Sequence, residues 1–340
     1  TTVAEYLQDL NYTTAAFGKW HLGGEGYLPK DQGFEFALAG SRDGMPGSYY
    51  YPFSSKLFQL PELEKLGKKG DYLTDLLTDQ AIDFLQEDHQ QPFFLYLSYF
   101  AVHTPIQGKK ELADKYRAAG DTSKYGAAYA AMVENLDRNV GRVLDVLSTE
   151  SHDKNTLVVF TSDNGGLATS DPPVTTNAPL RGGKGSLYEG GIRVPLIIKH
   201  PQLTDTTVCH VPVILEDIFP TIIELTQGSD TQLGLLEFHG RSLLPLWKNT
   251  NLPDRSLFWH FPHYGNMAGS VPASAIRKGD YKLIRFYEDK RTELYNLERD
   301  PGETTNLVGE EPDLVVQLAE ELSELKQKMK AQEPTPPGGK

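Results

Sequence analysis

Cysteine and long hydrophobic runs are both scarce in this sequence. Its 340 residues include one cysteine, Cys209, so no disulfide can form within the chain. A free cysteine usually behaves as a small apolar residue, and we therefore expect Cys209 to be buried. The longest apolar run, residues 93–102, is much shorter than the roughly 20 residues that a membrane-spanning helix needs, so we expect no membrane span and interpret this run as a buried strand.

Basic residues are also fewer than acidic ones. The chain carries 33 Lys and Arg residues against 46 Asp and Glu residues, which gives a net charge of -13 at pH 7. An acidic surface repels polyanions, so the composition argues against nucleic acid as a partner. Any anionic ligand must then be recognised by a few basic side chains gathered at one place.

The length predicts more than one hydrophobic core, because a single core stops growing at about 250–300 residues. We predict a large α/β domain over residues 1–250 and a smaller C-terminal domain over residues 251–332. Residues 333–340, rich in Pro and Gly, are expected to form a disordered tail. The sequence leaves the oligomeric state open.

Helical and extended patterns alternate through the first 200 residues. Apolar residues recur at helical spacing in residues 3–10, 71–87 and 132–147, and short extended runs occur at residues 11–18, 93–97, 157–160 and 194–198. Such alternation predicts a mostly parallel sheet sandwiched by helices, with the chemistry at the carboxyl ends of the strands. Residues 213–223 are expected to form a further helix, interrupted by Pro220.

Short strands follow after residue 250. We predict strands at residues 256–261, 273–277, 281–287 and 292–297, with turns at residues 278–280 and 288–290. A final helix is expected to begin near Pro312, since proline is favoured in the first turn of a helix. The C-terminal domain is therefore predicted to be a small antiparallel sheet plus a helix.

Two hard oxygen donors stand at the end of one predicted strand. Residues 157–166 read as an apolar strand followed by Asp163 and Asn164, a carboxylate and a carboxamide. Ca²⁺ and Mg²⁺ prefer such ligands, so the pair is a candidate metal site. An Asn-Gly pair after a strand is also ordinary turn chemistry, and this structural interpretation stays open.

Three further segments accompany this strand end. Residues 18–23 read Gly-Lys-Trp-His-Leu-Gly, residues 102–105 read Val-His-Thr-Pro, and residues 184–195 form a Gly-rich segment that begins with Lys. In this order the four segments resemble the type I sulfatases, the formylglycine-dependent branch of the alkaline phosphatase superfamily. The resemblance extends from the first residue to about Leu307. It implies an alkaline phosphatase-like fold and an arylsulfatase-like sulfuric ester hydrolase, acting on a sulfated carbohydrate or an aryl sulfate in the periplasm or outside the cell.

Two hallmarks of that family have no counterpart in these 340 residues. They are an Asp-Asp metal pair and the Cys/Ser-x-Pro-x-Arg nucleophile motif, and Cys209 lacks the Pro and Arg neighbours that conversion to formylglycine requires. The chain begins without Met, at Thr1, where a helical pattern is already under way. We therefore expect the nucleophile segment, with its formylglycine and two acidic ligands, to precede Thr1 in the natural protein.

The resemblance assigns four basic side chains to catalysis. Lys19 and His21 would lie beside the formylglycine, where His21 helps to accept its proton, and His103 and Lys184 would bind the sulfate and stabilise the departing oxygen. A sulfate ester carries charge that must be held while its S–O bond breaks, which suits fixed cations. An imidazole can exchange a proton near neutral pH while lysine stays a cation. Taken one at a time, each of these residues is better interpreted as a solvated loop residue, and only the four together, in this order, favour catalysis.

The sequence gives a weaker indication of which side chains would bind the remainder of the substrate. Residues 259–264 combine aromatic rings with His260 and His263, and Arg277 begins the following hairpin. Aromatic and polar groups together suit a sugar ring, so these two histidines and the arginine are predicted to bind the carbohydrate. A packed aromatic corner that holds the small sheet is the alternative, and residues 49–53 leave the same two interpretations open.

Other functions fit parts of the same pattern. The Gly-rich segment resembles a Walker A loop, but Gly185 stands where Ser or Thr must follow Lys184, so the spacing excludes that interpretation. A phosphodiesterase or phosphonate monoester hydrolase of the same superfamily would share the sheet and the Asp-Asn tip. A non-catalytic homologue that binds sulfated glycans is the third alternative. The Tyr-Glu-Gly-Gly run at residues 188–191 favours the sulfatase.

An incomplete metal shell has a measurable consequence. Ca²⁺ takes about 6–8 oxygen ligands, and Asp163 and Asn164 supply only part of them, while the resemblance places the others in the segment before Thr1 and on the substrate. We expect these 340 residues alone to bind calcium weakly and to release no sulfate from an aryl sulfate. Sub-micromolar affinity in a calorimetric calcium titration, or measurable turnover, would contradict this expectation.

Overall fold

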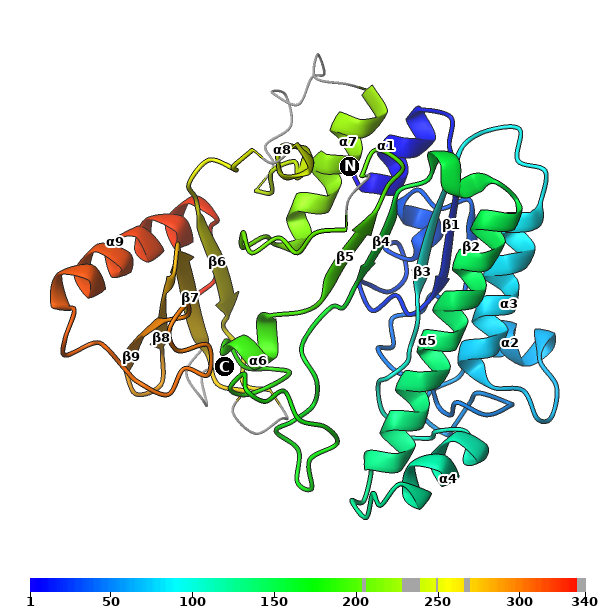
Figure 1. Ribbon diagram of the computed structural model, residues 1–340, viewed down its shortest axis with the longest axis horizontal. Helices are drawn as coiled ribbons and strands as arrows, with labels where there is room; N and C mark the ends of the chain where they lie inside the picture. Colours follow the sequence, from blue (N-terminus) through cyan, green and yellow to red (C-terminus); the bar gives the residue numbers. More distant parts are fainter. Residues whose placement is uncertain (204–205, 228–238, 249, 266–269, 335–340) are drawn as a thin grey trace. The chain divides into compact units, whose positions relative to one another are not determined.

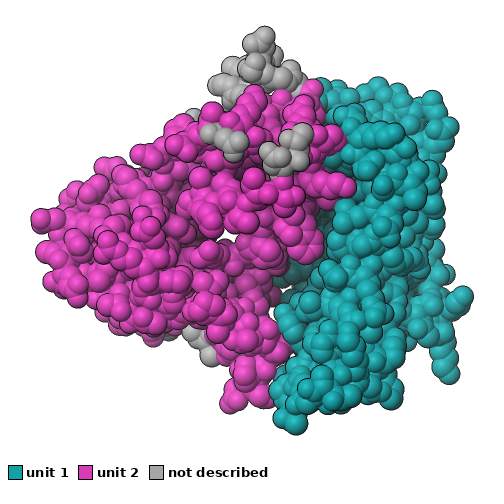
Figure 2. Space-filling model, in the orientation of Figure 1, with its two compact units in different colours: residues 1–157 teal, residues 158–340 magenta. Residues whose placement is uncertain are grey.

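The described residues form two compact units. The computed structural model describes residues 1–203, 206–227, 239–248, 250–265 and 270–334. Residues 1–157 make the first unit and residues 158–340 the second (Figure 2). The domain boundary predicted near residue 250 falls inside the second unit and stays a prediction. No helix in these ranges is both long enough and apolar enough to cross a membrane.

A three-stranded parallel sheet with the order β2-β1-β3 organises the first unit (Figure 1). Its strands are β1 (Thr13–Gly18), β2 (Phe36–Leu38) and β3 (Phe93–Ser98). The strands predicted at residues 11–18 and 93–97 are confirmed, whereas β2 is too short to leave a sequence signal. The central strand β1 is almost wholly buried. The run at residues 93–102 was expected to be a buried strand, but β3 ends at Ser98 and its side chains are only partly buried.

Helices cover both faces of this sheet. They are α1 (Val3–Asp9), α2 (Pro61–Leu66), α3 (Leu73–Gln86), α4 (Lys110–Ala118) and α5 (Gly126–Thr149), with the 3-10 turns η1 (Pro29–Gln32) and η2 (His152–Asn155). Successive side chains of β1 point to opposite faces. Ala16 packs in one cluster with Ala4 of α1, while Phe17 meets Phe84 of α3 with ring centroids 5.9 Å apart. The helices α1 and α3 therefore lie on opposite faces.

The aromatic residues 49–53 belong largely to the core of the first unit. Tyr49 and Phe53 are fully buried, and the ring of Tyr49 stacks on Tyr72 with centroids 5.7 Å apart. The structural interpretation of this segment therefore holds for these two residues. Tyr50, by contrast, is exposed.

The second unit begins with a pair of antiparallel strands, β4 (Val158–Thr161) and β5 (Leu196–Lys199). The predicted sheet was mostly parallel, and this pair is an antiparallel exception to it. The segment between the strands contains only the four-residue helix α6 (Glu189–Ile192). Because it lacks a long crossover helix, the chain re-enters the sheet at the end where it left, and an antiparallel pair results.

Two local predictions in the second unit are corrected. Pro220 does not interrupt a helix, because the 3-10 turn η3 (Leu215–Asp217) ends first and α7 (Ile218–Gln227) then begins, so that proline lies in the first turn of α7, where it is tolerated. Cys209 is exposed rather than buried, because residues 206–210 form neither helix nor strand and are all exposed.

A four-stranded antiparallel sheet with the order β6-β7-β8-β9 confirms the predicted C-terminal pattern (Figure 1). The remaining elements are α8 (Leu244–Trp247), β6 (Ser256–Phe261), β7 (Ala273–Lys278), β8 (Tyr281–Phe286), β9 (Thr292–Asn296) and α9 (Pro312–Lys328). The helix α9 begins at Pro312, as predicted. Most of the predicted tail, residues 335–340, lies outside the described residues.

The two faces of the C-terminal sheet have different partners. Ile276 and Leu283 pack with Leu318 and Leu322 of α9. Residues that alternate with them, including Ala275 and Ile284, pack instead against Leu187 and Tyr188 of the Gly-rich loop. One face of the sheet thus carries α9, and the other carries the loop that contains Lys184.

Candidate active site

The carboxyl ends of β1 and β3 bring three predicted catalytic residues to one edge of the first unit's sheet. Lys19 and His21 follow β1, and His103 follows β3. The two strands pair in parallel with Gly18 opposite Ser98. Beyond this pair the Lys19 N–H donates to the Ser98 carbonyl at 2.7 Å, and the Ser98 hydroxyl donates to the Lys19 carbonyl at 2.6 Å. The strands are therefore fastened together where these residues leave the sheet.

The last residue of β1 must be glycine. Gly18 has a φ of +111°, which L side chains rarely adopt, and a Cβ atom there would lie 2.0 Å from the Ser98 carbonyl oxygen. The close approach of the two backbones positions Lys19. This explains in structural terms why the segment at residues 18–23 begins with glycine.

The imidazole of His21 rests on a loop that follows β2. His21 has a left-handed φ of +56°, which is uncommon for a residue other than glycine, and its N–H donates to the Ser41 carbonyl at 3.1 Å. A Cβ atom added at Gly44 would lie 2.4 Å from Nδ1 and 2.5 Å from Cε1 of His21. The ring thus lies directly against Gly44, at a place where a side chain would displace it.

His103 is held through its backbone and one ring nitrogen. Its N–H donates to the Phe100 carbonyl at 2.8 Å, and its own carbonyl accepts from the Tyr49 hydroxyl at 3.0 Å. Burial raises the pKa of Tyr49, so this hydroxyl remains a donor. Nδ1 lies 2.9 Å from the Thr104 carbonyl oxygen, which can only accept a proton. In the neutral ring Nδ1 therefore carries the hydrogen and Nε2 the lone pair.

The predicted metal ligands of the second unit stand where β4 ends. Asp163 is exposed and Asn164 is half-buried. The next residue, Gly165, donates its N–H to the Gly191 carbonyl at 3.0 Å. A Cβ atom on Gly165 would lie 1.8 Å from the Gly190 carbonyl oxygen. The tip after β4 and the helix α6 are therefore in direct backbone contact, which requires glycine at position 165.

The Gly-rich loop brings Lys184 beside the same tip. The Lys184 N–H donates to the Gly166 carbonyl at 3.1 Å. The carboxamide of Asn177 donates to the carbonyls of Gly166 at 2.9 Å and Gly182 at 3.0 Å, so one side chain joins the two loops. Sequence reasoning missed Asn177, because a single Asn in a loop gives no sign of such a contact.

The donor chemistry of the tip suits a hard cation. The Asn164 amide group donates to the Gly165 carbonyl at 2.9 Å, which leaves the carboxamide oxygen as the atom that a cation would use beside the Asp163 carboxylate. In the described part of the chain, no group of three or more His, Cys, Asp and Glu side chains lies close enough together to hold a metal. The residues present fit a metal ion in kind but supply only part of its shell.

His260 is engaged on both sides of its ring within the second unit. Nδ1 lies 2.6 Å from the Ser274 hydroxyl, and Nε2 lies 2.6 Å from the Gln332 carbonyl oxygen. Because a carbonyl oxygen only accepts, Nε2 carries a hydrogen. A substrate that used this ring would have to replace one of these two partners.

His260 and Arg277 lie on opposite faces of the C-terminal sheet. His260 pairs with Ser274 across β6 and β7, and Arg277 lies three residues beyond Ser274, so its side chain points the other way. The Arg277 guanidinium lies 3.7 Å from the Glu189 carboxylate of α6. His263 is exposed beyond the end of β6. A common role of these residues in carbohydrate binding stays a prediction.

Polar side chains fasten the Gly-rich loop to the C-terminal sheet. The Arg181 guanidinium lies 4.0 Å from the centre of the Tyr188 ring and donates to the Tyr295 hydroxyl at 3.0 Å. The hydroxyls of Tyr188 and Tyr295 both donate to the Glu293 carboxylate at 2.8 Å. Burial, reinforced by Glu293, raises the pKa of Tyr188 to about 12, so this hydroxyl stays protonated.

A buried ion cluster lies beside these contacts. The Lys282 ammonium of β8 lies 2.8 Å from the Glu189 carboxylate and 2.6 Å from the Glu303 carboxylate, and their exposed fractions are 0%, 3% and 0%. Glu303 also accepts the Glu189 N–H at 2.7 Å. Sequence reasoning missed this cluster, although a lysine at an inward position of the apolar strand Tyr281–Phe286 was a usable signal.

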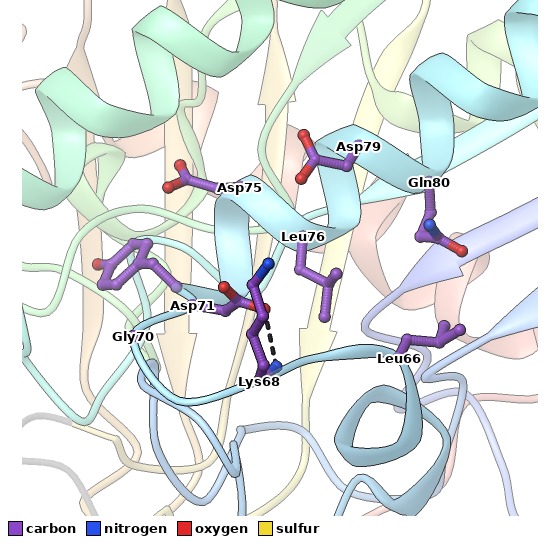
Figure 3. Close-up of a pocket in the computed structure, with 9 residues that line it drawn as sticks. Leu66, Lys68, Gly70, Asp71, Asp75, Leu76, Asp79 and Gln80 are labelled. Atoms are coloured by element: carbon purple, nitrogen blue, oxygen red, sulfur yellow. Dashed lines mark hydrogen bonds between the residues drawn. The ribbon is translucent and has the colours of Figure 1, made fainter.

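The first unit has a surface pocket of its own. It has a volume of about 410 Å³ and is lined by residues between Leu66 and Gln80, at the start of α3 (Figure 3). Of its carboxylates, Asp71 accepts the Lys68 N–H at 2.8 Å, and Asp75 forms an ion pair with Lys109. None of the predicted site residues lines it.

Comparison with known proteins identifies the family. The sequence profile of the family described as Sulfatase matches residues 1–229, and the profile described as N-sulphoglucosamine sulphohydrolase, C-terminal, matches residues 183–330. The chain belongs to the sulfatase family. The two matches overlap on the Gly-rich loop of this sulfatase chain, the segment that joins Lys184 to the C-terminal sheet. The predicted membership of the type I sulfatases, in the alkaline phosphatase superfamily, is confirmed.

Curated relatives cover much of this sulfatase chain. The "Sulfatase" of Formosa agariphila is 39% identical over 265 residues, which are 71% of this chain and 47% of that protein. The N-acetylgalactosamine-6-sulfatase of Mus musculus is 30% identical over 278 residues, which are 75% of this chain and 50% of that protein. The chain thus spans about half the length of these two relatives.

Solved structures of similar proteins confirm the predicted alkaline phosphatase-like α/β class. The structure of Ps i-CgsB in complex with k-i-k-neocarrahexaose matches with a TM-score of 0.76 and 28% identity, covering 95% of this chain and 73% of that one. A protein in complex with its substrate D-glucosamine-2-N,6-O-disulfate matches with a TM-score of 0.72 and 22% identity, covering 98% of this chain and 83% of that one. At that identity the second match supports the fold alone.

Replacing Gly44 with alanine is expected to displace the His21 imidazole, since the new Cβ would overlap the ring. The predicted role of His21 in proton transfer then implies a fall in kcat on the order of 10²-fold for the full gene product, the effect expected when a catalytic group is misplaced by about 1 Å. The imidazole signals of His21 in NMR spectra should shift as well. Gly24→Ala is the matched control, because its Cβ would lie 3.8 Å from Arg42. Equal behaviour of the two variants would refute the contact.

Replacing Glu303 with glutamine is expected to flatten the pH dependence of stability. Burial raises the pKa of Glu303 above its ordinary 4.5, so the folded protein holds a proton that the unfolded chain has released. The free energy of unfolding therefore falls as the pH rises from about 4.5 through the folded-state pKa. Urea denaturation at several pH values measures this slope. Glu298→Gln, at an exposed position, should keep the slope of the unsubstituted protein.

Proposed function

We propose that this protein hydrolyses sulfate esters of a sulfated carbohydrate. The observation that supports this proposal most directly is where the predicted site residues lie within each unit of this sulfatase-family chain. Lys19, His21 and His103 share one sheet edge, and Lys184 is joined by backbone to the tip with Asp163 and Asn164. Similar proteins include one named for N-acetylgalactosamine and one solved with k-i-k-neocarrahexaose, which supports a carbohydrate as the substrate.

In the proposed reaction the basic side chains hold the sulfate while the S–O bond breaks. By the family resemblance, Lys19 and Lys184 supply the positive charge that offsets the charge of the sulfate oxygens. His21 accepts a proton beside the formylglycine position that the family resemblance implies. The backbone bonds between β1 and β3 fix the starting points of Lys19, His21 and His103 before substrate arrives, so little reorganisation of these three residues is needed.

His103 is the proposed donor to the departing oxygen. The Thr104 carbonyl keeps the hydrogen on Nδ1, so protonation of the ring places the exchangeable proton on Nε2. An imidazolium with this orientation can donate from Nε2 to the alcohol that leaves the sulfate. The Tyr49 hydroxyl donates to the His103 carbonyl and so helps to hold His103 in place.

Asp163 and Asn164 are the proposed protein ligands of Ca²⁺, with Mg²⁺ as the alternative. When bound, the cation would supply positive charge to the sulfate oxygens. The chain's own part is to hold these two ligands on the β4 tip, which the contact between Gly165 and α6 fixes. Lys184 would then act on the same sulfate from the adjoining loop.

Removal of the Lys184 ammonium tests this function. In the full natural gene product that contains these residues, Lys184→Ala should lower kcat for sulfate release from a sulfated oligosaccharide by about 10²–10³-fold, the usual effect of losing one electrostatic stabiliser. Ion chromatography of inorganic sulfate measures the reaction. Lys199→Ala, at an exposed position of the same unit, is the control and should stay near full activity.

Two outcomes would overturn the proposal. Cleavage of a phosphodiester or phosphonate monoester without release of sulfate would assign the protein to phosphoryl chemistry. Binding of the sulfated oligosaccharide with no release of sulfate, in the presence of calcium, would make it a glycan-binding homologue.

A further inference from the structure

A fully buried lysine stands between the C-terminal sheet and the Gly-rich loop. The Lys282 ammonium contacts the carboxylates of Glu189 and Glu303. Arg277, on the same face of the sheet, lies 3.7 Å from Glu189 and is 18% exposed. The guanidinium of Arg193, which is 56% exposed, lies 4.0 Å from the same Glu189 carboxylate. Of these three cations, only Lys282 is fully buried and contacts both carboxylates.

The cluster acts on the first residue of α6 from two directions. The Glu189 side chain is bound by Lys282, and the Glu189 N–H is bound by the Glu303 carboxylate at 2.7 Å. A helix of four residues has almost no stability of its own. The position of α6 therefore depends on these contacts with the C-terminal part of the unit.

The helix α6 in turn is bonded to both segments of the unit that contain predicted site residues, the loop with Lys184 and the tip with Asp163 and Asn164. The Gly190 N–H donates to the Arg181 carbonyl at 2.8 Å, at the start of the loop that carries Lys184. The Gly191 carbonyl accepts the Gly165 N–H at 3.0 Å, next to Asn164. The Lys282 ammonium is thus linked to the β4 tip by a hydrogen bond to Glu189, the short backbone of α6, and the hydrogen bond between Gly191 and Gly165.

The buried Glu303 carboxylate makes this arrangement sensitive to Lys282. Glu189 has Arg277 and Arg193 as further cationic neighbours, whereas Glu303 forms its ion pair with Lys282. Removing one partner of a buried ion pair leaves an uncompensated charge in a medium of low dielectric constant, whereas removing both partners together leaves none. Without the lysine, Glu189 and Glu303 would also repel each other at the start of α6, and one relief open to them is to move apart, which shifts α6.

We propose that Lys282 is a positioning residue for the predicted active site. Its charge holds Glu189 and Glu303 together, and through α6 it fixes the Lys184 loop and the tip with Asp163 and Asn164. The significance for catalysis rests on the proposed function, but the positioning itself does not. The C-terminal sheet is, on this view, a support for the site.

Hydrogen exchange tests the positioning directly in this chain. Lys282→Met keeps the length of the side chain without its charge, and it should accelerate exchange of the Gly165 and Lys184 amides by at least about tenfold. Protection in α9 and in β1 should remain. Lys278→Met is the matched control, because it removes a lysine of the neighbouring strand whose ammonium forms a partly exposed ion pair with Glu321 at 2.7 Å. It should leave both loop amides unchanged.

The double variant Lys282→Met with Glu303→Gln removes both charges of the buried Lys282–Glu303 pair and should recover most of the lost protection. If Lys282→Met does not fold, Glu303→Gln alone carries the test, since it weakens the hold on the Glu189 N–H and should accelerate exchange at the same two amides. Unchanged exchange, acceleration spread evenly over the second unit, or a double variant no better than the single one would each overturn the proposal.

Activity of the full natural gene product gives a second measurement. Lys282→Met should lower kcat for sulfate release more than it raises KM, and the double variant should recover part of the loss. If that gene product releases no sulfate in any form, the proposed function fails while the exchange result still decides the role of Lys282.

Discussion

The second unit depends on one close backbone contact, between the tip after β4 and the helix α6. Gly165 donates to the Gly191 carbonyl, and its missing side chain allows the Gly190 carbonyl to approach. Through this contact two segments that are about 25 residues apart in the sequence are held together. The backbone of Lys184 is joined to the same tip by its own hydrogen bond to Gly166.

In the first unit a parallel strand pair brings the predicted catalytic residues together. Its predicted catalytic residues start from the ends of β1 and β3, and the bonds between Lys19 and Ser98 fasten those ends. In both units the backbone sets where the functional side chains begin, and glycine appears where two backbones must meet. Side-chain contacts, such as those of His21 with Gly44 and His103 with Thr104, then set the orientation of each ring.

Local signals in the sequence predicted the elements well and the long-range contacts poorly. The C-terminal strands and α9 were predictable because alternation, turn residues and Pro312 all act over a few residues. The antiparallel pairing of β4 and β5 was not, because it depends on how a long loop returns. The contact of Lys282 with Glu189 joins residues 93 positions apart. The sequence pattern indicates that Lys282 faces inward, but it does not indicate that Glu189 is its partner.

The contacts between the C-terminal sheet and the Gly-rich loop also determine when the loop can fold during synthesis. Tyr188 reaches its partner Glu293 only across a separation of 105 residues. A ribosome must therefore add most of the remaining chain before Leu187 and Tyr188 find their native surroundings, and contacts of such high sequence separation form slowly. Until then these apolar side chains stay open to water in the nascent chain, where chaperones bind and aggregation begins.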